Sequence, residues 1–222
     1  YESKEATEPL GIVMKDVYTE NLPDNMVKPD GTTEPLIRNV RILDLAEDGS
    51  MLRMWYSNAF SVTDDRVWSP TWMQHECVKR FGPPTPTGMI SNDLRIMRDC
   101  NLEQWKQAAK WQADCMNYMI AEHGVEVIFS HFHGPDMSGH MYMNVLKDRY
   151  DSRYTEEEIY QLAVGTYEMT DAYIGEFLHL LDEGWSVLVF SDHGLLSRKG
   201  DFDPLIGDNF NVNAGVMCEL GY

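Results

Sequence analysis

Two short apolar runs, separated by a long helical segment, limit the folds open to this chain. The first run, residues 127–130, lies in a predicted strand over residues 125–132, and the second, residues 187–191, lies in a predicted strand over residues 185–191. Continuous apolar runs of this length predict strands that are buried on both faces. Between them, from Thr155 to Gly184, apolar residues recur at helical spacing. Strand, helix and strand form a βαβ unit whose strands are parallel, so we predict an α/β fold with a mostly parallel sheet flanked by helices.

Further helices are predicted on either side of this unit. Apolar residues at helical spacing predict one helix over residues 101–123, which Gly124 ends. The long helix before the second strand begins at a capping box of Thr155 and Glu158. A short helix is expected near residues 212–220.

The first 85 residues have a different pattern. Residues 36–45 and 51–56 flank an Asp48-Gly49 turn and predict a β-hairpin. A proline-rich stretch at residues 81–86 marks a boundary. We therefore divide the chain into a small β-rich cap or insertion, residues 1–85, and an α/β part of a catalytic domain, residues 86–222. Aromatic residues of the cap either stack on a base or, as we favour, form the core of the hairpin: Trp55, Tyr56, Phe60, Trp68 and Trp72.

Composition excludes some classes of partner. A formal net charge of −18 disfavours a nucleic-acid polymer, because no basic surplus is available to release counterions. The sequence contains no apolar run long enough to span a membrane. Four cysteines without CxxC spacing predict reduced thiols and a cytoplasmic location, with a secreted or periplasmic parent as the alternative. A first residue other than Met and an abrupt end predict a piece of a longer protein.

A carboxylate and an imidazole follow each predicted strand. Asp136 and His140 come after the first, and Asp192 and His193 after the second. Parallel strands share a carboxyl edge, so these four side chains are expected to meet at one rim of the sheet. Carboxylate oxygens and imidazole nitrogens bind divalent metals, which predicts a metal site. We interpret Gly134-Pro135 as a tight exit from the strand rather than the start of a helix.

Two more histidines lie close to this predicted edge. His131 and His133 alternate along the strand, so they face one side of it. An HxH pair is a possible ligand couple of a metal-dependent amidohydrolase. The alternative that we favour places one of them beside a ligand and leaves the other packed or solvated. His75, His123 and His179 are expected to be structural.

The two clusters resemble motifs of one superfamily. Residues 135–140, PDMSGH, resemble the PDxxGH segment of the alkaline phosphatase superfamily, and residues 191–194, SDHG, resemble its DHG segment. The nearest branches are type I phosphodiesterase/nucleotide pyrophosphatase and phosphohydrolase/phosphomutase. The resemblance covers about residues 100–222 and rests on the order of both motifs around the long helix.

The resemblance implies a centre of two divalent ions, Zn or Mn. By that resemblance, Asp136 and His140 would hold one ion, and Asp192 and His193 the other. The Asp after the first strand, the Thr or Ser nucleophile and the last His of the superfamily are not found in this sequence. The loop from Thr85 to Gly88 carries hydroxyls but lacks the preceding Asp-Gly strand. The nucleophile is therefore expected outside this chain, in the remainder of a parent protein.

These arguments predict a metal-dependent phosphoric-ester hydrolase, a phosphodiesterase or phosphatase that acts on a small phosphate-ester substrate. This chain would be a fragment of that enzyme, with little activity alone. Three alternatives stay open: a phosphomutase of the same superfamily, a metal-dependent amidohydrolase built on His131 and His133, and a non-catalytic module that binds a partner.

Overall fold

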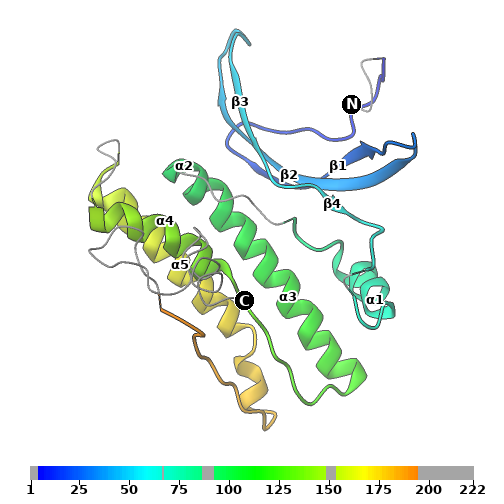
Figure 1. Cartoon of the computed structure of the whole chain (residues 1–222), viewed down its shortest axis with the longest axis vertical. Helices are drawn as coiled ribbons and strands as arrows, with labels where there is room; N and C mark the ends of the chain where they lie inside the picture. Colours follow the sequence, from blue (N-terminus) through cyan, green and yellow to red (C-terminus); the bar gives the residue numbers. More distant parts are fainter. Residues whose placement is uncertain (1–4, 67, 87–92, 149–153, 195–222) are drawn as a thin grey trace, which may run out of the picture.

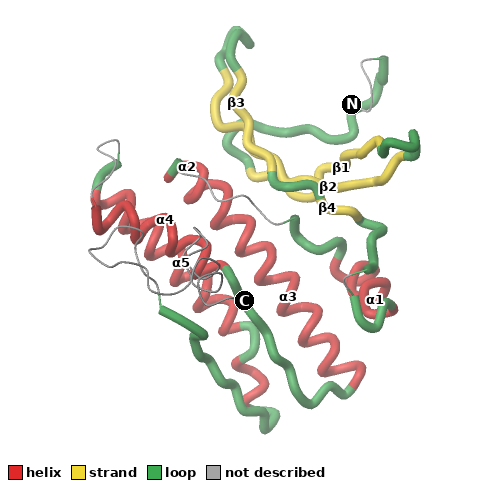
Figure 2. The backbone as a smooth tube through the Cα atoms, viewed as in Figure 1, coloured by secondary structure: helices red, strands yellow, loops and turns green. Residues whose placement is uncertain are grey.

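The protein is described here from a computed structural model that defines residues 5–66, 68–86, 93–148 and 154–194. A curved antiparallel sheet lies against one end of a layer of helices (Figures 1 and 2). The sheet consists of β1 (Tyr18–Val27), β2 (Thr33–Leu45), β3 (Leu52–Tyr56) and β4 (Phe60–Ser61). The helices are α1 (Trp72–Phe81), α2 (Leu94–Ile96), the π-helical turn η1 (Met97–Asn101), α3 (Leu102–His123), α4 (Gly134–Asp148), α5 (Glu156–Gly175) and the 3₁₀ turn η2 (Leu178–Leu181).

Strand β2 is the centre of the sheet, because β1, β3 and β4 all pair with it in antiparallel fashion. The β2–β3 pair confirms the predicted hairpin, and Gly49 turns the chain with a φ of 73°. A φ in this range is one that glycine adopts at little cost. Alternate residues of β2 face the helices, including Asn39, Arg41 and Leu43.

Polar contacts join the sheet to the helices. The Arg41 guanidinium donates to the Asp99 carbonyl at 2.6 Å, and Arg95 Nη1 donates to Asp44 Oδ1 at 3.0 Å. Beside them, Leu43, Trp55 and Cys100 form a small buried cluster. Trp55 is thus part of the core, as expected for the cap. These contacts fix the sheet on the turn that leads into α3.

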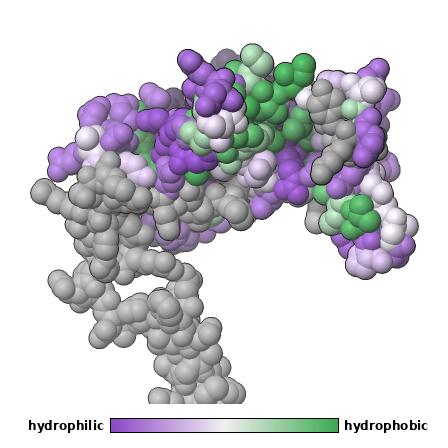
Figure 3. All heavy atoms as spheres, turned by 90° about the horizontal axis from the view of Figure 1, so that it is seen from above, coloured by the Kyte–Doolittle hydropathy of each residue, from purple (hydrophilic) through white to green (hydrophobic). Residues whose placement is uncertain are grey.

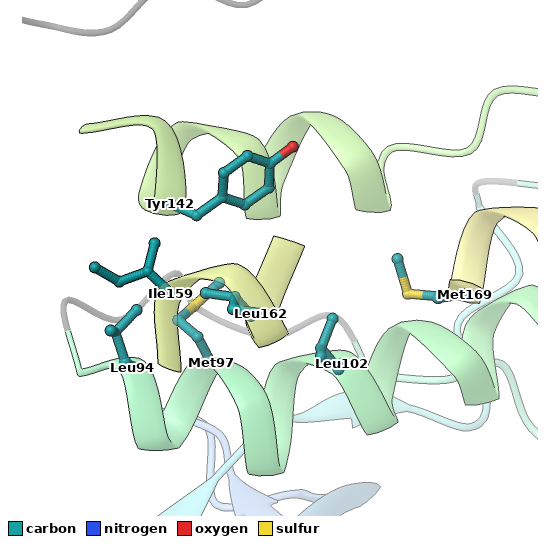
Figure 4. Packing of buried hydrophobic residues seen from close by; sticks show 7 residues of the cluster. All are labelled: Leu94, Met97, Leu102, Tyr142, Ile159, Leu162 and Met169. Carbon is teal, nitrogen blue, oxygen red and sulfur yellow. The ribbon is translucent and has the colours of Figure 1, made fainter. Parts of the chain in front are cut away.

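The main core lies between α5 and the continuous α2–η1–α3 rod, with α4 covering it (Figure 4). Its buried members come from all of these elements: Leu94, Met97, Leu102, Tyr142, Ile159, Leu162 and Met169. Gly124, with a φ of 63°, caps the end of α3 as the sequence predicts. The predicted capping box is also present at the start of α5, where Thr155 Oγ1 accepts from the Glu158 amide at 3.2 Å. Burial on one face of each helix holds this layer together.

The described part of the chain does not contain the predicted parallel sheet. Residues 125–132 and 185–191 are extended but have no strand assignment, and the sheet that the structure contains is antiparallel. Val127 and Phe129 are each 82% exposed, and Leu188 is 81% exposed. The two segments do lie side by side, since the rings of Phe129 and Phe190 are 6.2 Å apart. Two strands alone form no stable sheet in water, because they lack neighbours that bury their faces and pair their backbone groups.

Three further differences from the sequence-based expectations concern helices. Gly134-Pro135 does begin a helix, α4. Proline fits the first turn of a helix, because N–H groups there have no hydrogen-bond partner within the helix and the N–H that proline lacks is not needed. The predicted cap contains α1, which turn signals and a hairpin pattern did not indicate. A single long helix was expected up to Gly184. Instead, α5 ends at Gly175, and the separate 3₁₀ turn η2 follows it. The helix expected near 212–220 lies outside the described residues.

Hydrophobic residues are not confined to the interior. Seen from above, onto the end of the molecule where the sheet lies, they form a patch on the surface (Figure 3). Within the described residues, no helix has the length and apolar character needed to cross a membrane.

Candidate metal centre

The first pair of candidate ligands lies on α4. Asp136 is in the first turn of this helix and His140 is one turn later, so both side chains share a face. His140 Nε2 lies 3.1 Å from Asp136 Oδ1. The spacing of four residues between Asp136 and His140 is therefore helical spacing. In the sequence, this spacing was the feature that could have predicted a helix at this position.

His133 contacts the same carboxylate from the segment before the helix. Its Nε2 lies 2.7 Å from Asp136 Oδ2, within hydrogen-bond distance. The His131 ring lies beside it, with 5.0 Å between the ring centroids. His133 is thus the histidine of the HxH pair that touches a candidate ligand, and it holds one of the two oxygens of Asp136 in place.

The second pair follows the extended segment that ends at Ser191. His193 Nε2 lies 3.7 Å from Asp192 Oδ1 and 4.0 Å from Asp136 Oδ1. The His193 Nδ1–H faces the Gly194 carbonyl at 3.1 Å, and Ser191 Oγ donates to the His193 carbonyl at 2.5 Å. The bond to Gly194, followed by the charges of Asp192 and Asp136, raises the pKa of His193. With Nδ1 engaged, Nε2 is the nitrogen that faces the carboxylates.

Two motifs that are far apart in the sequence therefore meet at Asp136. His140 comes from its own helix, and His193 comes from the loop after the second extended segment. Asp192 is the outermost of the four, with a side chain that is 69% exposed. Across the described residues, no group of three or more His, Cys, Asp and Glu side chains is arranged to hold a metal ion. The contact that joins the two motifs is between one pair of side chains, His193 and Asp136.

One atom of this cluster fits a cation. Asp136 Oδ1 is buried and accepts no hydrogen bond among the described residues, and His140 Nε2 lies 3.1 Å from it. A buried carboxylate oxygen without a donor is costly, and a divalent ion would satisfy it. Oxygen and imidazole nitrogen are ligands that Zn and Mn accept. The kinds of donor atom at this place are thus compatible with the ions that the motifs imply, although the described residues form no complete ligand set.

The loop with candidate nucleophiles is only partly described. Thr85 is buried, and its Oγ1 has no hydrogen-bond partner in the described regions. Next to it, the Pro86 carbonyl accepts from the side-chain amide of Gln104 on α3. Thr87 and Gly88 lie outside the described residues. The nucleophile is still expected elsewhere than in this chain.

Comparison with known proteins gives one match. The family model described as type I phosphodiesterase / nucleotide pyrophosphatase matches residues 10–214, which is most of the chain. No curated protein and no solved structure matches it. The match includes both motifs and also the region predicted to be a cap, whereas the resemblance seen in the sequence covered about residues 100–222. The chain belongs to the type I phosphodiesterase/nucleotide pyrophosphatase family, within the alkaline phosphatase superfamily.

Proposed function

We propose that this chain supplies half of the active site of a metal-dependent hydrolase that cleaves small phosphate esters. In this proposal Asp136 and His140 bind one divalent ion, and Asp192 and His193 bind a second. The observation that carries it is the 4.0 Å approach of His193 Nε2 to Asp136 Oδ1, which brings the two motifs together. Family membership supports hydrolysis of a phosphodiester or pyrophosphate over the amidohydrolase alternative.

The residues of the chain have distinct parts in this proposal. His133 holds Asp136 Oδ2, so that Oδ1 is left for an ion. The Gly194 carbonyl engages His193 Nδ1, which selects the tautomer whose Nε2 lone pair is available. Divalent ions at these side chains would offset the charge that builds up on phosphate oxygens during in-line displacement. A chain with a net charge of −18 needs such a local positive field to attract a phosphate ester.

The proposal also concerns the extended segments. We infer that residues 125–132 and 185–191 become neighbouring parallel strands when further strands of the parent protein pair with them. Their exposed side chains and their contact through Phe129 and Phe190 support this inference. A sheet formed in this way would fix the distance between Asp136 and His193.

Metal content tests the ligand assignment. In the natural full-length protein that carries this chain, His140→Ala and Asp192→Asn are each expected to lower bound Zn or Mn, because each removes one of the two ligands that this chain supplies to an ion. Elemental analysis after dialysis measures this content, and binding of Zn²⁺ or Mn²⁺ to the metal-free protein gives the affinity. His179→Ala, a change in the η2 turn, is the matched control and should keep the metal content of the wild type. Unchanged metal content in both ligand variants would contradict the assignment.

Turnover by the 222-residue chain tests the location of the nucleophile. The chain should hydrolyse a p-nitrophenyl phosphodiester slowly even with added Zn²⁺ or Mn²⁺, because the attacking hydroxyl is expected elsewhere in the protein. The longer protein is the positive control. Rapid hydrolysis by the chain alone, removed by Thr85→Ala, would place the nucleophile in the loop that follows α1.

A further inference from the structure

Helices α1 and α3 bury two cysteines in their interface. Cys77 on α1 is 1% exposed and Cys115 on α3 is 8% exposed. Each thiol lies near enough to the other to affect its pKa. The proposed phosphoesterase chemistry uses neither of them. Two thiols buried together in the interface of two packed helices are an arrangement that can become covalent.

Contacts on both sides of the two cysteines fix the register of the helices. Toward the start of α3, Trp111 Nε1 donates to the Gly82 carbonyl just after α1, at 2.9 Å. Toward its end, the Tyr118 hydroxyl donates to Glu76 Oε2 at 3.0 Å, and the Arg80 guanidinium lies 4.2 Å from the centre of the Tyr118 ring. Cys115 lies between Trp111 and Tyr118 on the same face of α3. The pairing of Cys115 with Cys77 is thus a consequence of how the helices pack.

The other cysteines have different surroundings. Cys100 is fully buried with Leu43 and Trp55 at the joint between the sheet and the helices. Its burial raises its pKa to about 12, and the further causes of that shift are charged side chains, Arg41 and Asp99 first among them. Cys218 lies outside the described residues. In the described part of the chain, Cys77 and Cys115 are therefore the thiols that the fold pairs.

We propose that Cys77 and Cys115 form a disulfide, which links α1 to α3, when the chain meets an oxidising thiol–disulfide pool such as glutathione. One cysteine thiolate attacks a sulfur of oxidised glutathione, the S–S bond breaks, and one reduced glutathione leaves. The other cysteine thiolate then attacks the mixed disulfide, and the second reduced glutathione leaves. The two cysteines lose two electrons and two protons in total, which reduce one molecule of oxidised glutathione to two of the thiol.

Burial determines when this reaction takes place. Burial raises the pKa of Cys77 and that of Cys115, so the thiolates that react are scarce in the folded chain. The disulfide is therefore expected to form quickly while the chain folds, and slowly afterwards, through opening of α1 away from α3. Once formed, the bond constrains the unfolded chain over the long loop between the two cysteines.

Refolding in a redox buffer tests the proposal. The chain is unfolded in denaturant with reductant and refolded in a mixture of reduced and oxidised glutathione, and free thiols are then alkylated. Non-reducing peptide mapping by mass spectrometry should recover the peptides of Cys77 and Cys115 as one linked species, lighter by two hydrogen atoms than their sum. The melting temperature of the oxidised chain should exceed that of the reduced chain by roughly 5–10 °C. Dithiothreitol should remove the difference.

Single variants separate this pair from the other cysteines. Cys77→Ala and Cys115→Ala should each abolish the linked species and the gain in melting temperature, whereas Cys100→Ala should keep both. Circular dichroism of the reduced variants shows whether each one folds. A linked species that contains Cys100 or Cys218 in the wild-type chain would overturn the proposal. Complete alkylation of Cys77 and Cys115 after refolding with oxidised glutathione would overturn it as well.

Discussion

Asn39 is the residue at which β1, β2 and α3 meet. Its side-chain amide donates to the Tyr18 hydroxyl at 2.9 Å and to Gln107 Oε1 at 2.7 Å, and its Oδ1 accepts from the Asn21 amide at 3.0 Å. The residue has no exposed surface. The three bonds are partly buried, so several partly shielded polar groups depend on this one side chain.

Asn39→Leu should lower the free energy of unfolding by about 2–4 kcal/mol, because it keeps the volume but leaves buried polar groups without partners. Urea denaturation followed by circular dichroism measures the change. Asn25→Leu, at an exposed position of β1, is the matched control and should change stability by less than about 0.5 kcal/mol. A loss in Asn39→Leu no larger than that of the control would show that these hydrogen bonds contribute little.

The candidate ligands show how far single residues can be predicted from sequence. The motifs around Asp136 and His193 were sufficient to expect that they would lie near each other, and the structure places them 4.0 Å apart. The sequence predicted that either His131 or His133 would lie beside a ligand, but it did not show that His133 would be the one that contacts Asp136. That contact depends on the direction of the chain as it enters α4, and Gly134-Pro135 sets that direction. A binding role for these residues stays a prediction.

At the scale of the elements, α5 depends on its first turn. Thr155 Oγ1 accepts from the Glu158 amide, and Glu158 Oε2 accepts in return from the Thr155 amide at 2.8 Å. Thr155→Ala should cost about 1 kcal/mol of unfolding free energy, because it removes half of this capping box. Thermal denaturation with a fitted enthalpy measures the cost. Glu157→Gln in the same turn is the control, with an expected change of a few tenths of a kcal/mol.

The elements that were predicted correctly are those whose signals are local. The α3 stop at Gly124, the capping box of α5 and the hairpin around Gly49 each depend on residues within one or two turns of the chain. Residues 125–132 and 185–191 differ, because an apolar run becomes a strand only when another strand pairs with its backbone. Whether such a partner strand is present depends on the whole sheet and not on the local sequence. The local pattern therefore predicts extended backbone, as observed, but not the pairing.

At the scale of the whole molecule, the exposed apolar side chains of these two segments are the main departure from an ordinary folded surface. The double variant Phe129→Ser, Leu188→Ser should change the unfolding free energy of the chain by less than about 1 kcal/mol, because both side chains are already more than 80% exposed. It should also lower the fluorescence of a dye that binds exposed hydrophobic surface. Urea denaturation and dye titration measure the two effects.

The matched control is Leu162→Ser, which changes a side chain with no exposure in the main core. It should cost about 3 kcal/mol or more, because it leaves a cavity and buries a hydroxyl. A similar loss in the double variant would show that residues 125–132 and 185–191 are buried in solution. Such a result would favour a strand pairing that the described structure lacks.

The place of Asp136 and His193 at the ends of these same two segments has a consequence for control of activity. Under the proposed function, a polypeptide that covers Phe129 and Phe190 would also fix the distance between Asp136 and His193. Assembly and ligand geometry are then thermodynamically linked, so an ion that favours the assembled spacing also tightens the assembly, and by the same free energy. Under the proposed function, the activity of the chain would therefore depend on its assembly with that polypeptide.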